Sequence, residues 1–462
     1  MRHRHLSQRL AAGALLLATA APAQAPHCKP AGTAFERRVE EIVSTVNEGR
    51  PGTLSQLVAD VWLSPTAGGP PSAAVLADLG LWHWRSRRIT LLAACAGTDS
   101  ASAYALLGNE LSEETDSLMM TIDPATGRLR QYRIRYGVRV PSVAAASDDA
   151  MIREVRRITR RLVDAGVFAG EVLIAKEGVP IFNEAFGIGN LERRTPVRLG
   201  ERYSNASMGK LFTATAVMQL VQQGRLRLED SLGMLVPSMK KPRGIGSVTV
   251  AQLLSHTSGI VPGADTLAFK PGTRFEYSNY GFNVLADSIV APLVGRPFAE
   301  HYADAIFKPA GMTQTISLMT KEPRPALLPN YAVNFDTTGF TSEPNALMQN
   351  LPAMGSGHFF TTGTDLLRFA EAFRKEGFLA PGVVETMRTE KFPGSGYGYG
   401  VMLWRGPGVW GHGGDLPGTD ADLEIYGTSG YVAVVLSNRS GVNDPIRRRI
   451  AALLAGRPGA LK

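Results

Sequence analysis

Apolar and polar positions recur with two different periods along the chain, and the period changes from block to block. Apolar residues return every three or four positions over residues 35–46 and 54–61, which predicts two amphipathic helices. Alternation with a period of two follows, most clearly over residues 118–122 and 129–136, and predicts strands. Residues 30–140 are therefore expected to form a small α+β accessory domain.

The last strand of this block has two chemically different faces. Tyr132, Ile134 and Tyr136 point one way and are expected to face a core. Arg133 and Arg135 point the other way. We interpret the arginine face as solvated, with an anionic surface as the alternative contact.

Residues 141–149 are expected to be a linker, because a proline, three consecutive alanines and two aspartates interrupt the pattern before a helix N-terminus. The next helix carries a stripe of arginines on one face: Arg153, Arg156, Arg157, Arg160 and Arg161. We interpret this stripe as the wet side of a helix packed on a sheet. An acidic membrane surface is the alternative.

The remaining strands lie at the two ends of the C-terminal block. A hairpin is predicted over residues 172–183, and further strands over residues 399–403, 409–412, 421–426 and 431–436. Between these ends the sequence is mostly typical of helix and loop. The simplest topology is an antiparallel sheet closed from both ends, with a helical insertion.

The first residues differ in composition from both blocks. Arg2, Arg4 and Arg9 precede an apolar run and then small residues, which is typical of a secretory signal peptide over residues 1–23, cleaved after Ala23. The expected product is a soluble exported protein, periplasmic or secreted, without an integral membrane segment. Loss of the leader lowers the formal net charge from +8 to +5, which favours neither nucleic acid nor a strong polyanion as partner.

Only two cysteines, Cys28 and Cys95, occur in the chain. In an exported protein they are candidates for a disulfide, and two unpaired thiols are the alternative because sequence fixes no geometry. No C-x-x-C or H-E-x-x-H pattern is present, so neither a metal nor another cofactor is expected.

The first candidate for chemistry is a serine at the start of a predicted helix. Ser207 precedes a strong helix-forming run that ends at Gly224, and Lys210 lies three residues on, on the same helical face. The lysine amine can therefore approach the hydroxyl, and the helix N-terminus favours negative charge there. Ser238 begins a second S-x-x-K match, but it lies between two prolines and is interpreted as a chance match.

A serine activated by lysine needs a second group that passes a proton to the leaving atom. The candidate is Tyr277, in a Y-S-N motif that is expected to lie in a loop directly before a helix. Use of Tyr277 as a base would require the positive field of Lys210, with His412 as a further contributor, to stabilise the phenolate. A second Y-x-N match begins at Tyr203, too close to Ser207 in sequence, and its tyrosine is expected to pack in the core.

The third candidate is the H-G-G-D stretch from His412 to Asp415, at the end of a predicted strand. Gly413 and Gly414 would let the backbone approach a ligand closely, and N–H groups here could complete an oxyanion hole with that of Ser207. A strand-end histidine with a purely structural role is the alternative interpretation of His412.

Together, S-M-G-K at Ser207, Y-S-N at Tyr277 and H-G-G at His412 resemble the motifs of the serine β-lactamase and penicillin-binding-protein superfamily, in its class C-like and esterase-like branch. Similar stretches lie at residues 170–175, 253–259, 307–313 and 362–366. The resemblance covers about residues 150–456. It implies a β-lactamase/transpeptidase-like α/β (α+β) fold, with an antiparallel sheet flanked by helices and a helical subdomain.

The resemblance also implies an acyl-enzyme mechanism. Ser207 would attack a carbonyl group while Lys210 and Tyr277 shuttle protons. Asn279 would position the substrate, and the N–H groups of Ser207 and Asp415 would hold the oxyanion.

One departure from the superfamily affects the expected substrate. Penicillin-processing members usually carry K-T-G or K-S-G as the third motif, whose lysine and hydroxyl grip the substrate carboxylate. His412 is only partly charged near neutrality and Gly413 has no hydroxyl, so recognition of β-lactam or D-alanyl carboxylates is disfavoured. The H-x-G form is similar to that of esterases and D-amino-acid peptidases of the superfamily.

The expected function is therefore that of an exported serine hydrolase that cleaves an ester or amide of a small molecule or peptide through an acyl-Ser207 intermediate. A D-stereospecific peptidase, D-alanyl carboxypeptidase or β-lactamase acting on cell-wall-like substrates is the second hypothesis, and a non-catalytic binding protein with the same fold is the third. The absence of a G-x-S-x-G motif argues against an α/β-hydrolase. Loops over residues 335–354 and 397–404 are expected to supply pocket walls, while the natural substrate and oligomeric state stay open.

Overall fold

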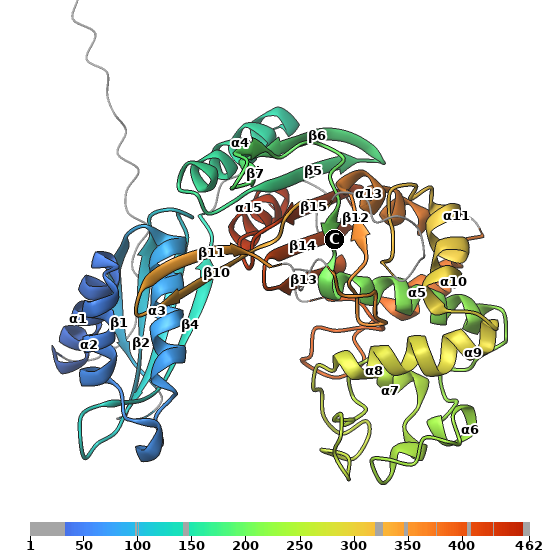
Figure 1. Ribbon diagram of the computed structural model, residues 1–462, viewed down its shortest axis with the longest axis horizontal. Helices are drawn as coiled ribbons and strands as arrows, with labels where there is room; N and C mark the ends of the chain where they lie inside the picture. Colours follow the sequence, from blue (N-terminus) through green and yellow to red (C-terminus); the bar gives the residue numbers. More distant parts are fainter. Residues whose placement is uncertain are drawn as a thin grey trace, which may run out of the picture.

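The computed structural model describes residues 33–97, 99, 101–141, 147–318, 327–345, 350–375, 377–403, 408–427 and 429–455. The expected leader over residues 1–23 and Cys28 lie outside these ranges, as does most of the expected linker. Two units are visible in the described chain, an N-terminal layer of helices on a sheet and a larger unit with its own sheet and a helical region (Figure 1).

The N-terminal unit packs three helices on a four-stranded antiparallel sheet in the order β1-β2-β3-β4. Its elements are α1 (Thr33–Glu48), α2 (Pro51–Val61), the short η1 (Pro65–Ala67), α3 (Ser72–Ser86), β1 (Ile89–Ala96), β2 (Ser102–Asn109), β3 (Thr115–Ile122) and β4 (Leu129–Arg139). The expected core face of β4 is confirmed, since Tyr132, Ile134 and Tyr136 pack against the buried cluster of this unit. The sequence did not indicate α3, because this helix is packed on more than one side and has no single apolar stripe.

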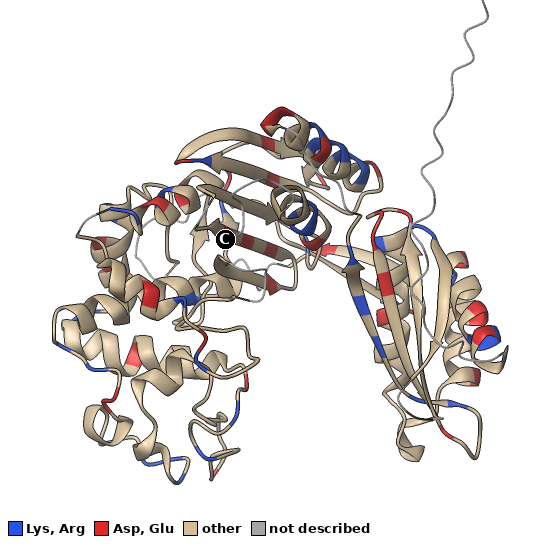
Figure 2. Ribbon diagram, turned by 180° about the vertical axis from the view of Figure 1, so that it is seen from behind, with Lys and Arg blue, Asp and Glu red and all other residues tan. Residues whose placement is uncertain are grey.

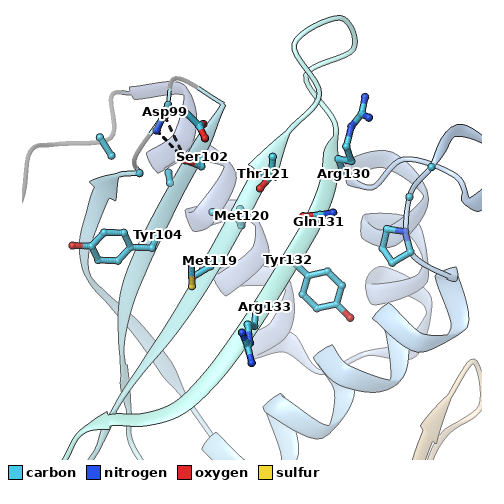
Figure 3. A pocket seen from close by; sticks show the side chains of 16 residues that line it. Asp99, Ser102, Tyr104, Met119, Met120, Thr121, Arg130, Gln131, Tyr132 and Arg133 are labelled. Carbon is cyan, nitrogen blue, oxygen red and sulfur yellow. Dashed lines mark hydrogen bonds between the residues drawn. The ribbon is translucent and has the colours of Figure 1, made fainter. Parts of the chain in front are cut away.

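Cys95 lies in β1, fully buried and disulfide-bonded. Cys28, the partner expected from the sequence, lies outside the described residues, so the pairing itself stays a prediction. Cys95 shares one cross-strand row with Tyr104, Met119 and Arg133, on the sheet face opposite the helices. Side chains around this row border a hollow of about 1010 Å³ (Figure 3).

The larger unit is built on a five-stranded antiparallel sheet in the order β13-β14-β15-β5-β6. Its strands are β5 (Gly170–Lys176), β6 (Val179–Phe186), β13 (Val409–Leu416), β14 (Thr419–Tyr426) and β15 (Tyr431–Ser437). The pairing of β15 with β5 confirms that the sheet is closed from both ends of the block. The strand expected over residues 399–403 is wrong, since Gly400 turns the chain with a φ of 71° and Met402 makes a single bridge to Gly411.

Helices cover both faces of this sheet. Alternate residues of β5 and β15 pack against α4 (Asp148–Asp164) and α15 (Asp444–Ala455) on one face. The intervening residues pack against α5 (Lys210–Gln222) and α13 (Gly363–Ala372) on the other face. The N-cap of α4 is Ser147, whose hydroxyl accepts a hydrogen bond from the Ala150 N–H at 3.1 Å.

The helical region lies on the side of α5 away from the sheet (Figure 1). In sequence, its helices come between β6 and β13. Its helices are α6 (Leu232–Leu235), η3 (Ile245–Ser247), α7 (Val250–Leu254), α8 (Asn279–Asn283), η4 (Val284–Val290), α9 (Ala291–Val294), α10 (Phe298–Tyr302), η5 (Ala303–Phe307), α11 (Lys308–Ala310) and α14 (Pro381–Met387). Short strand pairs join β7 (Ile188–Asn190) to β8 (Thr195–Pro196) and β9 (Tyr203–Ser204) to β12 (Phe360–Thr361).

A hairpin of the larger unit reaches across to the N-terminal unit, and it was not expected from the sequence. It consists of β10 (Tyr331–Asp336) and β11 (Gly339–Pro344), which lie over α3 (Figure 1). Phe335 is buried in the core of the N-terminal unit, against Gly80. The expectation that the loop from Phe335 onward forms a pocket wall is therefore wrong for Phe335, which joins the two units.

Arginines of the larger unit also bind the N-terminal unit. Basic residues gather along α4, and two of them, Arg157 and Arg161, pair with Glu113 in the β2–β3 connection (Figure 2). Arg448 of α15 forms a bidentate salt bridge with the Glu114 carboxylate. Part of the arginine stripe on α4 therefore forms a contact between the two units. Neither interpretation made from the sequence, a solvated face or a membrane-binding face, included this contact.

Among the described residues, no helix is both long enough and apolar enough to cross a bilayer.

Candidate active site

Ser207 lies in a tight 3-10 turn, η2 (Ala206–Gly209), that leads directly into α5. The expected position at a helix start is confirmed. Ser207 is partly exposed, whereas Ala206, Met208 and Gly209 around it are buried, so the turn presents the serine alone. Ala206 has a φ of 42°, a strained conformation for a residue with a side chain.

Glycines let neighbouring segments approach this turn closely. A Cβ on Gly414 of β13 would lie 2.7 Å from the Ser207 nitrogen. A Cβ on Gly357 would lie 1.7 Å from the carbonyl oxygen of Ala206. Only glycine fits at these two positions, which explains why Gly414 belongs to the site although it has no reactive group.

Lys210 follows one turn later and is fully buried. Its Nζ donates to Asn279 Oδ1 at 2.7 Å and to the Ser356 carbonyl at 3.0 Å. Within the described part of the chain it forms no ion pair, and burial lowers the pKa of Lys210 to about 7. At neutral pH a large fraction of this amine is therefore uncharged and able to accept a proton.

Tyr277 lies directly before α8, as expected, and its ring centroid is 4.8 Å from Lys210 Nζ. The Ser207 side chain is close enough to lower the pKa of the Tyr277 hydroxyl. The Tyr277 side chain is 38% exposed, yet desolvation raises the pKa of Tyr277 to about 12. The nearby Ser207 side chain lowers this pKa, but by a smaller amount. Tyr277 is therefore a neutral hydroxyl near neutral pH, and the phenolate that its use as a base would require is disfavoured.

Strand β13 passes the turn that carries Ser207, and one edge of this strand has no neighbouring strand in the sheet. Gly411 exchanges both of its main-chain hydrogen bonds with Met402, outside the sheet, so its N–H points away from β14. Every second residue repeats this direction, which aims the N–H of Asp415 toward the same open edge. Because Gly414 touches the Ser207 backbone, the Asp415 and Ser207 nitrogens lie on adjoining segments.

His412 is fully buried, and both of its ring nitrogens have partners within the protein. Its Nδ1 donates to the Gly413 carbonyl, and its Nε2 accepts from the hydroxyl of Tyr397 at 2.9 Å. This geometry favours the structural interpretation of the His412 ring over a substrate-binding one. The ring supports Tyr397, which lies edge-on to Tyr277 at 6.3 Å between centroids.

Two residues under the site were missed as candidates from the sequence, His256 and Tyr397. Both are buried and pack against each other at 4.6 Å between ring centroids. His256 stands in the L-L-S-H-T-S-G stretch that carries part of the family resemblance, which was the available signal. Nothing in the local pattern distinguished Tyr397 from a core residue, whereas Trp404 in the same expected pocket loop lies outside the described residues.

A hollow of about 280 Å³ opens beside Tyr277 and Asn279. Ile260, Val261 and Tyr280 line one part of it and Ser278 and Asn279 another, so its lining is mixed, with somewhat more apolar than polar surface. Glu276, the one acidic residue in the lining, is paired with Arg274 at 3.0 Å. This space is suited to an uncharged acyl or side-chain group.

The competing sequence matches are separated from this site. Ser238 lies in an exposed turn and not at a helix start, as expected of a chance match. Tyr203 is buried in the core, also as expected. The hollow on the N-terminal sheet is lined by Ser102 but by neither lysine nor histidine, so it lacks the arrangement found around Ser207. No group of three acidic, histidine or cysteine side chains placed to hold a metal occurs in the described ranges.

An antiparallel sheet, a helical region and a serine at the start of the helix between them define the β-lactamase/transpeptidase-like fold of serine hydrolases. A family model described as Beta-lactamase matches residues 155–457, and the chain belongs to this family, within the serine β-lactamase and penicillin-binding-protein superfamily. Penicillin-binding protein 4 of Amycolatopsis lactamdurans is 29% identical over 278 residues, which cover 51% of this chain and 72% of that protein.

Two solved structures show the same fold. D-amino acid amidase from Ochrobactrum anthropi SV3 aligns with a TM-score of 0.53 and 22% identity, covering 66% of this chain and 99% of that chain. EstCE1, described as a hydrolase with promiscuous acyltransferase activity, aligns with a TM-score of 0.55 and 21% identity, covering 66% of this chain and 99% of that chain. At these identities the likeness concerns the fold.

Proposed function

We propose that this protein is a serine hydrolase that cleaves esters or amides of uncharged acyl groups through an acyl-Ser207 intermediate. The observation that carries the proposal is the placement of a buried Lys210, whose pKa is about 7, one turn after Ser207 and 4.8 Å from the ring centroid of Tyr277. A nucleophile, a neutral amine and a neutral hydroxyl are the groups that a two-step acyl transfer needs.

In the first step the Ser207 Oγ forms a bond to the substrate carbonyl carbon, and its proton passes to the uncharged amine of Lys210. The oxyanion accepts hydrogen bonds from the N–H groups of Ser207 and Asp415. When the bond to the leaving group breaks, the leaving atom takes a proton from the Tyr277 hydroxyl, which regains one from Lys210.

In the second step water attacks the acyl carbon and gives its proton back along the same route. The bond between the acyl group and Ser207 breaks, and Ser207 recovers its proton. Asn279 holds Lys210 through Oδ1, so its amide N–H groups are the part of the side chain left to meet a substrate.

The buried and fully bonded His412 supports a preference for uncharged substrates. A ring whose two nitrogens already bind Tyr397 and Gly413 offers no spare donor to a carboxylate. The hollow beside Tyr277, whose lining is somewhat more apolar than polar, supports the same preference.

The test is to incubate the mature protein with a fluorophosphonate probe, p-nitrophenyl acetate and a chromogenic cephalosporin, and to locate any adduct by mass spectrometry. Ser207→Ala should abolish labelling and ester turnover. Ser238→Ala, at the second S-x-x-K match, is the matched control and should leave both unchanged. Absence of an adduct at Ser207 would support the non-catalytic alternative, and fast cephalosporin turnover would contradict the preference for uncharged substrates.

A D-stereospecific peptidase or amidase is the second candidate, favoured by the relation to penicillin-binding protein 4 and the fold shared with D-amino acid amidase. Turnover of D-alanine amide and D-alanyl-D-alanine peptides at rates above that of p-nitrophenyl acetate would favour it. Export after cleavage at Ala23 is also a proposal, and Edman sequencing of the secreted protein tests it.

A further inference from the structure

The buried imidazole of His256 lies under the ring of Tyr277. The two ring centroids are 4.3 Å apart and the ring planes are inclined by 37°. His256 is 1% exposed and has a φ of 58°, in the left-handed region that residues with side chains rarely adopt. Strain of this kind persists where surrounding contacts over-determine a residue.

His256 also binds the backbone on both sides of Tyr277. The N–H of Glu276 donates to the His256 carbonyl at 2.8 Å. The N–H of Ser278 donates to His256 Nδ1 at 3.0 Å. One residue therefore fixes the chain before Tyr277, the chain after it and the face of its ring.

His256 is itself held by an aromatic enclosure. Its ring centroid lies 5.0 Å from that of Phe282, 4.6 Å from that of Tyr397 and 5.9 Å from that of Phe275. This packing leaves the imidazole little freedom to rotate, so a displacement of Tyr277 would require the whole enclosure to rearrange.

The hydrogen bonds assign the tautomer of His256. Because Nδ1 accepts from Ser278, the ring proton of the neutral form is on Nε2, which is buried and has no partner among the described residues. A buried donor without a partner costs on the order of 1–3 kcal/mol. An apolar side chain would avoid that cost but could not accept the bond from Ser278.

The charge of His256 also suits the site. Burial and, second, the nearby Lys210 keep the pKa of His256 well below its usual range. The ring therefore stays neutral over the pH range in which Lys210 changes charge, and it does not oppose protonation of the amine.

We propose that His256 is a positioning residue for Tyr277: it sets the place of the Tyr277 hydroxyl beside Ser207 through one ring contact and two hydrogen bonds to the flanking backbone. This inference rests on the proposed function, since it concerns a hydroxyl that relays a proton. His256 acts through Tyr277 and need not touch the substrate.

Two variants separate the contacts. His256→Asn keeps an acceptor for Ser278 and tolerates the left-handed backbone, but it removes the ring. His256→Phe keeps a ring but removes the acceptor. Because small displacements of positioned groups cost up to about a hundredfold in rate, we expect kcat for p-nitrophenyl acetate to fall about tenfold in the first and about a hundredfold in the second, with KM within about twofold.

The decisive measurement is a double-mutant cycle with Tyr277→Phe, scored by kcat and by the rate of fluorophosphonate labelling at Ser207. If His256 acts through the Tyr277 hydroxyl, His256→Asn should change either rate by less than about twofold once that hydroxyl is absent. The matched control is His301→Asn in α10, a half-buried imidazole that lies next to a tyrosine and whose Nε2, like that of His256, has no partner among the described residues. It should leave kcat unchanged, and thermal melts confirm that each variant is folded.

Unchanged kcat in both His256 variants would overturn the inference, and so would a full loss that persists in the Tyr277→Phe background. Both results leave the proposed function intact as long as Ser207→Ala is inactive. If the wild-type protein neither turns over the ester nor labels at Ser207, the proposed function fails first, and the positioning role fails with it.

Discussion

Lys210 Nζ donates a 2.7 Å hydrogen bond to Asn279 Oδ1, which joins the first turn of α5 to the first residue of α8. The second acceptor, the Ser356 carbonyl, is neutral as well. A fully buried amine held by two neutral acceptors has little to stabilise its charge, so desolvation determines its pKa.

The pH dependence of acylation follows from this lysine. We expect the rate of Ser207 labelling by a fluorophosphonate to rise with pH through an apparent pKa near 7, because the uncharged amine is the base and burial lowers the pKa of Lys210 to about 7. Tyr277, with its pKa raised to about 12, should add no downward limb below pH 10. A rate that falls as pH rises through 7 would instead indicate that protonated Lys210 is the active form.

The same lysine should make the folded protein less stable than a variant without it. Lys210→Met removes a group whose folded pKa of about 7 lies below the ordinary value of 10.5. Between these values the unfolded chain binds more protons, so wild-type stability rises with pH there, by up to about 1.4 kcal/mol per pH unit relative to the variant.

Urea unfolding of both proteins at pH 7, 8 and 9 measures this slope. The exposed Lys240→Met serves as the control and should show no pH-dependent difference from wild type. If the free energies of unfolding of wild type and Lys210→Met differ by the same amount at all three pH values, the lowered pKa of Lys210 is refuted.

Tyr277→Phe should lower kcat for p-nitrophenyl acetate by about 10²- to 10⁴-fold, because it removes the hydroxyl that relays the proton. The free energy of unfolding should change by less than about 1 kcal/mol, since Tyr277 is 38% exposed. Steady-state kinetics and urea unfolding measure the two quantities.

Tyr203→Phe is the matched control for this prediction. Its hydroxyl is buried without a partner in the described part of the chain, so its removal should leave the rate unchanged and stability equal or higher. Equal rates for the wild type and Tyr277→Phe would exclude the proton relay.

Phe335 should contribute to the stability of both units. It is 4% exposed and packs so closely on Gly80 that a Cβ there would lie 2.0 Å from the ring. Phe335→Ala should lower the free energy of unfolding by about 3–5 kcal/mol.

The neighbouring Phe340 on the same hairpin is 40% exposed, so Phe340→Ala should cost less than about 1 kcal/mol. Differential scanning calorimetry should also show whether Phe335→Ala splits the melting of the two units into separate transitions. Equal stability of the two variants would show that the hairpin does not hold the units together.

Local pattern was sufficient to predict the parts of the fold that a single period defines. The core face of β4 and the strand β14 follow from alternation of apolar and polar residues, whereas β5 and β15 follow from short apolar runs within one segment. Helix α3 and hairpin β10–β11 were not predicted from the sequence. The two elements pack on each other, so part of their apolar surface lies in a contact between the two units, which a local pattern does not reveal.

By itself, the sequence determined the family and pointed to Ser207, at the start of its helix, as the candidate nucleophile, because the order and spacing of the S-x-x-K, Y-S-N and H-G-G motifs can be read directly along the chain. Tertiary structure alone decided what each group does. It paired both ring nitrogens of His412 within the protein, placed His256 under Tyr277 and enclosed Lys210 without a counterion among the described residues. The physical reason is that proton affinity and hydrogen-bond partners depend on burial and on neighbours far away in sequence, which no local pattern records.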